Sequence, residues 1–203
     1  MLPDGFVSLS QICPSIVIGA NYATTENFTG SVVNGYRRVE SVFSKVGAEK
    51  LCAIQAEAAT LGYGLKVFDA YRPVKAVQHF QEWARSPEEN EAIKLRYYPT
   101  LTKAQLFEQG YIAQQSSHSR GSAVDLTLVD AQGRELDMGT IFDFFHETSH
   151  TMNRTITEAQ KRNRAILKSL MVKHGFKNFA QEWWHYSLVS EAFPGQYFDF
   201  DIE

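Results

Sequence analysis

The sequence predicts a single α+β domain, residues 1–203, in which helices cover a central and mainly antiparallel sheet. Hydrophobic residues make up 44% of the 203 residues and aromatic residues 13%, which is enough apolar material for one core. Segments with the two-residue period of strands alternate with segments of helical period, but without the regular strand–helix–strand order of a parallel sheet. No repeat or low-complexity linker divides the chain.

The first half of the chain is expected to contain two strands and two helices. The apolar run SIVIGA at 15–20 and the segment LKVFDA at 65–70 are typical of strands. Between them, residues 48–62 carry apolar side chains at helical spacing and end at a glycine, a favoured helix stop. A second helix is predicted over 73–86, because its first residue is a proline, which suits that position.

Two Thr-x-x-Gln patterns predict helix starts in the second half of the chain. Thr102 and Gln105 form a capping-box pattern for a short helix that ends at Gly110. Thr157 and Gln160 form the same pattern in front of a longer helix with an apolar face.

Two strands are also predicted in this half. The segment AVDLTLV at 123–129 alternates, so that Asp125 lies on the face opposite to its apolar neighbours. The segment WWHYSLV at 183–189 is the last predicted strand.

Composition argues against several classes of partner. The chain has 20 Lys and Arg against 23 Asp and Glu, a net charge of −3 without a basic run, so nucleic acid is not an expected partner. No stretch approaches the ~18 apolar residues of a membrane span. The N-terminus lacks the basic start of a signal peptide, and we therefore expect a cytoplasmic protein. Cys13 and Cys52 are far apart without a C-x-x-C pattern, so we expect two reduced thiols.

The segment SSHSRGSAVD, at 116–125, carries the first candidate chemistry. His118 and Asp125 are both good zinc ligands, but on one continuous strand they would face opposite sides. A turn at Gly121 would correct this, since glycine tolerates positive φ. The alternative is that His118 is only a hydrogen-bonded side chain among serines.

Two other segments place reactive side chains in rigid surroundings. In EWWHY, Glu182 and His185 stand among large aromatic residues, a setting that shifts pKa values and suits acid–base catalysis. Alternatively, this polar pair lies at the rim of a tryptophan core. In FDAYRP, Arg72 precedes Pro73 between a strand and a helix, so its guanidinium can project from a rigid junction. A surface ion pair is the alternative for Arg72.

The segment HETSH, at 146–150, matches the H-E-x-x-H pattern of a zinc-binding helix. That pattern would place His146 and His150 on one zinc ion, with the glutamate between them as the general base. The intervening Thr148 and Ser149, however, favour caps and turns over helix interiors. A metalloprotease of this kind is therefore a weaker alternative.

Three motifs, SSHSRGSAVDLTL, EWWHY and FDAYRP, occur together in this chain. Their combination resembles the D-alanyl-D-alanine dipeptidases of the vancomycin-resistance type, which belong to the zinc D,D-peptidases that share a fold with the Hedgehog signalling domain. The resemblance extends through NYATTENFTG at 21–30, RYYP at 96–99, DMGTIFDFF at 137–145 and YFDF at 197–200, so it spans nearly the whole chain.

The resemblance implies a metal site and a catalytic set. His118, Asp125 and His185 would bind one Zn²⁺ per chain, with water in the open fourth position. Glu182 would act as the general base and then as the proton donor, and Arg72 would stabilise the developing oxyanion.

The resemblance also implies contacts around these groups. Tyr22, Ser116 and Asp143 would help to hold the dipeptide, with Asp143 facing its free ammonium. Asp69 would orient a ligand or Arg72. From composition, and not from the resemblance, we expect Trp183, Trp184 and nearby aromatic residues to enclose a small cavity that excludes longer peptides. A histidine at position 146 is not part of the family's pattern, so HETSH is interpreted as a coincidence in a loop near this cavity.

We therefore predict zinc-dependent hydrolysis of the small-molecule substrate D-Ala-D-Ala to two D-Ala. The nearest alternative is a D,D-carboxypeptidase or a peptidoglycan endopeptidase of the same group, which would act outside the cytoplasm. A non-catalytic, zinc-bearing binding domain is the alternative from another class, but such a domain would not need both Glu182 and Arg72. The sequence does not specify the oligomeric state, the physiological metal, or whether the enzyme serves vancomycin resistance or ordinary cell-wall turnover.

Overall fold

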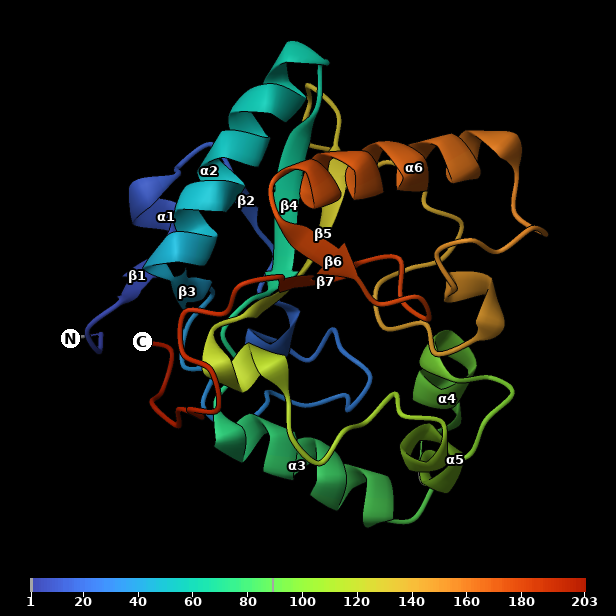
Figure 1. The fold of residues 1–203 in the computed structure, drawn as a ribbon. Coiled ribbons are helices and arrows are strands. Elements are labelled where there is room, and N and C mark those ends of the chain that lie inside the picture. The colour runs from blue at the N-terminus through green and yellow to red at the C-terminus, as the bar shows by residue number, and fades with distance from the viewer. Residues whose placement is uncertain (1, 89) are drawn as a thin grey trace.

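The computed structural model describes residues 2–88 and 90–203, and its central element is a five-stranded sheet in the order β2-β4-β5-β7-β6 (Figure 1). Strand β2 pairs parallel with β4, and every other neighbouring pair is antiparallel. This confirms the predicted α+β class with a mainly antiparallel sheet. The strands span Val17–Ile18 (β2), Gly64–Asp69 (β4), Ala123–Val129 (β5), Phe176–Asn178 (β6) and His185–Leu188 (β7).

Two helices pack against the sheet and three lie apart from it. In Figure 1, α2 runs beside β4 and α6 lies at the level of β4 and β5, whereas α3, α4 and α5 lie below the strands. Helix α2 contacts β4, α6 contacts β5 and β6, and α3 contacts α5. The helices span Lys45–Thr60 (α2), Val74–Arg85 (α3), Glu91–Tyr97 (α4), Lys103–Glu108 (α5) and Glu158–Lys173 (α6).

A small second sheet forms within the first 44 residues. Its antiparallel strands are β1 (Phe6–Ser8) and β3 (Val42–Ser44), and the short helix α1 (Leu9–Ile12) follows β1. Tyr36 forms an isolated bridge with Ile202 of the C-terminal tail, and Figure 1 shows this tail close to β1. Three short 3-10 segments complete the fold: η1 (Asn21–Ala23), η2 (Ser117–Arg120) and η3 (Glu147–Ser149).

Most predicted elements are confirmed, with shifted ends. Both capping boxes form, at the start of α5 and at the start of α6. The helix predicted from residue 48 begins at Lys45, and the last strand begins at His185 rather than at 183. The elements β1, α1, β3, α4 and β6 were not predicted, because segments this short do not show a reliable periodicity. Within the described part of the chain, no helix has the length and apolar character that a membrane crossing requires.

Strand β5 runs through the middle of the core. Its alternation is as predicted, but all seven of its residues are buried, including Asp125 and Thr127 on the polar face. Burial of a carboxylate is unfavourable unless charged or hydrogen-bonding groups surround it. The polar face of β5 therefore marks the place where such groups must gather.

Candidate active site

Strands β5 and β7 place two polar side chains opposite each other. Asp125 and His185 are register partners in the antiparallel ladder, and His185 Nδ1 lies 3.0 Å from Asp125 Oδ1. Facing residues of an antiparallel pair extend to the same side of the sheet, so this contact follows from the pairing of two predicted strands.

His118 reaches the same place from η2, the turn that precedes β5. Gly121 closes this turn at φ 59°, as the sequence predicted. His118 Nε2 consequently lies 3.4 Å from Asp125 Oδ2 and 3.3 Å from His185 Nδ1. The two histidines and the aspartate, which come from separate stretches of the chain, form one cluster.

A backbone carbonyl determines which nitrogen of His118 faces this cluster. His118 Nδ1 lies 2.6 Å from the carbonyl oxygen of Ala70, which can only accept, so Nδ1 donates the proton. In the neutral ring the lone pair is then on Nε2, which faces Asp125 and His185. Metal-binding histidines are commonly oriented in this way by a carbonyl or a carboxylate.

The donor set of this cluster fits zinc. One ligand atom from each of His118, Asp125 and His185 lies within 4.8 Å of the other two, and no second group of this kind occurs among residues 2–88 and 90–203. Burial would raise the pKa of Asp125, but the adjacent imidazoles of His118 and His185 lower it below its usual range. Two neutral imidazoles and an ionised carboxylate, with a fourth position open, are typical of catalytic zinc sites.

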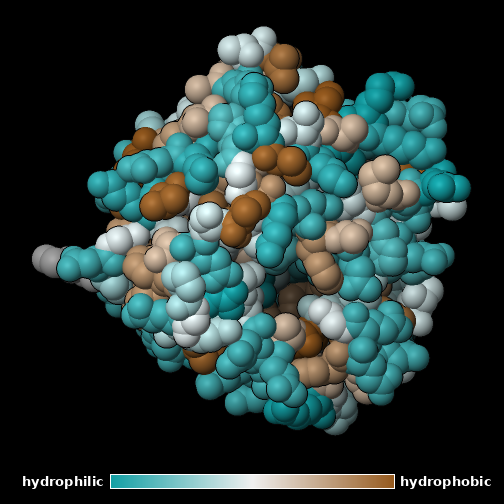
Figure 2. Space-filling model, in the orientation of Figure 1, coloured by the Kyte–Doolittle hydropathy of each residue, from teal (hydrophilic) through white to brown (hydrophobic). Residues whose placement is uncertain are grey.

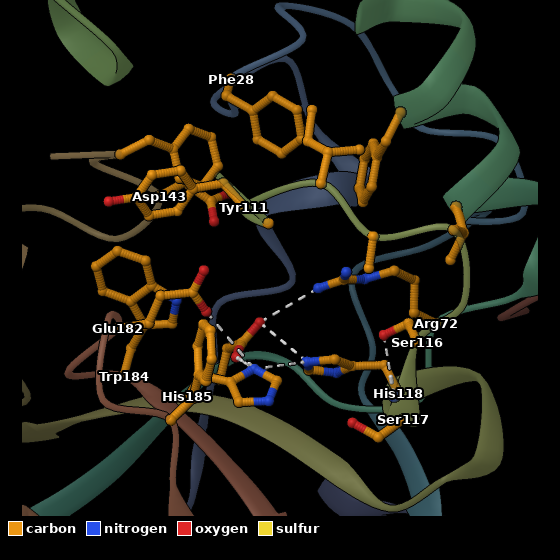
Figure 3. Close-up of a pocket in the computed structure, with 18 of the residues that line it drawn as sticks. Phe28, Arg72, Tyr111, Ser116, Ser117, His118, Asp143, Glu182, Trp184 and His185 are labelled. Carbon is orange, nitrogen blue, oxygen red and sulfur yellow. Dashed lines mark hydrogen bonds and ion pairs between the residues drawn. The ribbon is translucent and has the colours of Figure 1, made fainter. Parts of the chain in front are cut away.

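Glu182 lies just before β7, with its carboxylate beside the cluster (Figure 3). Glu182 Oε2 is 3.7 Å from His185 Nδ1. Burial raises the pKa of Glu182 to about 7; His185 lowers this pKa, and the negative charge of Asp125 adds to the rise. A carboxyl group with a pKa near neutrality can both accept and donate a proton at physiological pH.

Arg72 points into the same space from the junction of β4 and α3. Its Nε donates to Asp69 Oδ2 at 2.8 Å, and its Nη2 donates to Asp125 Oδ2 at 3.3 Å. The guanidinium carbon lies 5.3 Å from the ring of Tyr22 and 5.2 Å from the ring of Phe80. These ion pairs and cation–π contacts hold the guanidinium in one orientation next to the cluster.

Asp69 is itself held by a residue that the sequence did not indicate. Tyr36 OH donates to Asp69 Oδ1 at 2.7 Å, and both side chains are buried. The other oxygen of Asp69, Oδ2, contacts Arg72 and lies 3.5 Å from His118 Nδ1. Tyr36 is 33 positions from Asp69 along the chain, and no sequence pattern connects the two.

The three expected substrate contacts, Tyr22, Ser116 and Asp143, all line one cavity. Tyr22 OH donates to Asp143 Oδ2 at 2.8 Å. Asp143 is buried at φ 60°, a left-handed conformation that is uncommon outside glycine. Burial and the charge of Asp125 raise the pKa of Asp143 well above its usual range. Ser116 Oγ also accepts from the backbone N–H of His118 at 3.2 Å, so it helps to fix η2.

The cavity has a volume of about 200 Å³, and its polar lining consists mainly of the metal-ligand cluster, Glu182, Arg72 and the three expected substrate contacts. Figure 2 shows a hollow on this face of the molecule, below β6 and β7, and Figure 3 shows the labelled side chains around the space. Trp184 lines the cavity, as predicted. Trp183 does not, contrary to the prediction, because its indole is buried elsewhere and donates to Thr140. The aromatic part of the wall consists of Tyr22, Phe28, Phe80, Tyr111, Phe145, Phe179 and Trp184.

Comparison with known proteins identifies the family. A family model described as D-ala-D-ala dipeptidase matches residues 3–203. The chain belongs to this dipeptidase family. D-alanyl-D-alanine dipeptidases from Enterococcus faecalis, Enterococcus faecium and Streptomyces coelicolor are 43%, 44% and 41% identical to it, covering 99%, 98% and 97% of this chain and 100%, 98% and 98% of their own lengths. Among solved structures, a vancomycin-resistance D,D-pentapeptidase, VanY, in complex with Zn(II) aligns with 74% of each chain, at TM-score 0.44 and 16% identity.

In this member of the D-Ala-D-Ala dipeptidase family, HETSH does not form a zinc-binding helix. Its centre is η3, a single 3-10 turn, and His146 Nδ1 accepts from the backbone N–H of Thr148 as a cap. Neither His146 nor His150 belongs to the metal-ligand cluster found in the described residues. The carbonyl oxygens of Thr148 and His150 instead accept from Arg164, another contact that no sequence pattern indicated.

Proposed function

We propose that this protein hydrolyses the dipeptide D-Ala-D-Ala to two D-Ala in a zinc-dependent reaction. The observation that carries the proposal is the convergence of His118, Asp125 and His185 in a small cavity that Glu182 and Arg72 also enter. The names of the relatives, which match nearly end to end, support the same substrate.

His118 Nε2, a carboxylate oxygen of Asp125 and His185 Nδ1 would hold one Zn²⁺ per chain. When bound, zinc supplies a Lewis acid that polarises a carbonyl group and makes water a better nucleophile at neutral pH. In the neutral imidazole of His118, the Ala70 carbonyl holds the proton on Nδ1 and leaves the Nε2 lone pair for the metal, and Arg72 donates to the Asp125 carboxylate.

Glu182 would take a proton from the attacking water onto its carboxylate and then pass it to the leaving amine. Its raised pKa, about 7, suits both transfers. Arg72 would stabilise the negative charge that develops on the carbonyl oxygen of the scissile amide. Asp69 and the rings of Tyr22 and Phe80 hold its guanidinium in place before substrate arrives, which limits reorganisation during the reaction.

Asp143 would bind the free ammonium of the substrate. Without a cation nearby, burial disfavours its charged form, as its raised pKa indicates. An ammonium group in the cavity would stabilise that charged form, so the pair forms only when a free amino terminus is present. Tyr22 would orient the carboxylate through its hydroxyl, and Ser116 would contribute a polar contact from η2.

The experiment that tests this function combines metal analysis with a ninhydrin assay on three substrates: D-Ala-D-Ala, L-Ala-L-Ala and a pentapeptide that ends in D-Ala-D-Ala. We expect one zinc per chain and cleavage of D-Ala-D-Ala only. Equal cleavage of the pentapeptide would instead support a D,D-carboxypeptidase. The single-domain organisation and the cytoplasmic location remain predictions, which limited proteolysis and cell fractionation test separately.

A further inference from the structure

Arg164 of α6 is a buried arginine, and all three nitrogens of its guanidinium donate hydrogen bonds to backbone carbonyls. The residue is only 2% exposed. Its Nε donates to the carbonyl oxygen of Met138 at 2.7 Å, its Nη1 to that of His150 at 2.7 Å, and its Nη2 to that of Thr148 at 2.9 Å. Burial of a charge is strongly unfavourable unless hydrogen bonds surround it, so this arrangement indicates a specific role.

The three carbonyls lie at the two ends of one irregular segment, 138–150. Apart from the single turn η3 this segment has no helix or strand, and the carbonyls of Met138, Thr148 and His150 accept from a side chain outside it. The guanidinium of Arg164 donates these hydrogen bonds and thereby connects Met138 at the start of the segment to Thr148 and His150 at its end. At Gly139, with φ 88°, a Cβ atom would lie 3.3 Å from Arg164 Nη2, so the backbone approaches the guanidinium closely.

Segment 138–150 carries Asp143 in its middle. A non-glycine residue in the left-handed region persists only where the surrounding structure holds it. The ends of the segment are held by Arg164, and the Asp143 side chain is held by Tyr22. The direction in which Asp143 faces the cavity therefore depends on both contacts.

The same segment also supports the turn that carries Glu182. The backbone N–H of Trp183 donates to the carbonyl oxygen of Ser149 at 3.1 Å, and Trp183 Nε1 donates to Thr140 Oγ1 at 2.8 Å. Trp183 directly follows Glu182 in the chain. A shift of segment 138–150 would therefore move Glu182 as well as Asp143.

We propose that Arg164 is a positioning residue for the reaction, which fixes segment 138–150 so that Asp143 and Glu182 face the same cavity. This inference rests on the proposed function. Arg164 lines no part of that cavity and acts only through the segment. Displacement of a reacting group by about 1 Å can reduce a rate by ~10²-fold, so loss of the Arg164 hydrogen bonds should lower the measured rate.

The test compares Arg164→Lys and Arg164→Met with Arg162→Lys and Arg162→Met, which alter an exposed arginine of the same helix. We expect Arg164→Lys to retain one zinc per chain. Its kcat/KM for D-Ala-D-Ala should fall at least ~10-fold, and amide hydrogen exchange should accelerate in segment 138–150 and around Trp183 but not in α2. The Arg162 variants should match the wild type. Wild-type kinetics and exchange in Arg164→Lys would overturn the inference.

A double-mutant cycle separates positioning from a general loss of stability. If Arg164 acts through Asp143, the increases in KM caused by Arg164→Lys and Asp143→Asn should be non-additive. Increases that simply multiply would contradict the inference.

A second pair of variants covers the case in which the Arg164 variants do not fold. Thr140→Val removes the acceptor for Trp183 Nε1 and should lower kcat several-fold with KM unchanged, whereas Thr140→Ser should retain kcat. Unchanged kcat in Thr140→Val would contradict the link to Glu182.

A wild-type protein that fails to cleave D-Ala-D-Ala would refute the proposed function instead. Hydrogen exchange alone would then decide whether Arg164 holds segment 138–150.

Discussion

The carboxylate of Asp125 contacts the guanidinium of Arg72, with Asp125 Oδ2 3.3 Å from Arg72 Nη2. The other oxygen of the same carboxylate lies 3.0 Å from His185 Nδ1. One side chain at the centre of the sheet therefore connects the candidate metal ligands with the candidate oxyanion stabiliser. Metal binding and oxyanion stabilisation should be separable by mutation, because His185 belongs to the candidate ligand set and Arg72 does not.

Removal of a candidate ligand should abolish metal binding. We expect Asp125→Ala and His118→Ala to contain far less than one zinc per chain after dialysis. Substitution of a residue that only supports a metal ligand lowers metal affinity or activity by roughly 10–100-fold. Substitution of a ligand itself should therefore lower activity by more than ~10²-fold. Metal analysis by emission spectrometry measures this directly. His146→Ala is the control, and loss of zinc from that variant would contradict the assignment.

Glu182→Gln should retain zinc but lose turnover. The amide cannot take up the proton of the attacking water, so kcat should fall by ~10²–10⁴-fold, the typical contribution of general acid–base catalysis. Glu147→Gln, in the exposed glutamate of HETSH, should keep wild-type kcat. Steady-state kinetics on D-Ala-D-Ala decides between the two glutamates, and the opposite pattern would revive the HETSH alternative.

Arg72→Lys should lower kcat by ~10²–10³-fold, because a lysine ammonium cannot reproduce the oriented guanidinium. Asp69→Asn should have a smaller effect in the same direction, since it weakens the ion pair that orients Arg72. Arg37→Lys, in an exposed ion pair with Asp201, serves as the matched control. Normal kcat in Arg72→Lys would exclude Arg72 from transition-state stabilisation.

Asp143→Asn should raise KM for D-Ala-D-Ala. Truncation of one partner of a buried charge pair typically costs about 2–5 kcal/mol, so kcat/KM should fall by more than ~10-fold. Tyr22→Phe removes only one hydrogen bond to Asp143 and should raise KM less. The two variants are compared on D-Ala-D-Ala and on its N-acetyl derivative. An Asp143→Asn effect that does not depend on the free ammonium would contradict the assignment.

Much of the fold was predictable because its signals are local. The capping boxes at Thr102 and Thr157 involve residues three positions apart, and both formed as predicted. The turn at Gly121 was predictable for the same reason, because glycine tolerates the positive φ of the turn that places His118 on the side of Asp125. Strands of three residues, such as β1, β3 and β6, give no comparable signal.

The support around the site was not predictable from local patterns. Tyr36 reaches Asp69 across 33 positions, and Arg164 reaches Met138 across 26. The left-handed conformation of Asp143 likewise depends on contacts made by a whole segment rather than on its own neighbours. A family resemblance indicates which side chains to expect in a site, but only the packed chain shows which residues hold them in place.

The most direct measurement of the central claim is a crystal structure of the zinc-loaded protein, with anomalous diffraction data collected at the zinc edge. We predict a single strong peak about 2.0–2.2 Å from His118 Nε2, Asp125 and His185 Nδ1, the usual bond lengths for these donors. A zinc ion bound instead by His146 and His150, or no ion near Asp125, would contradict it.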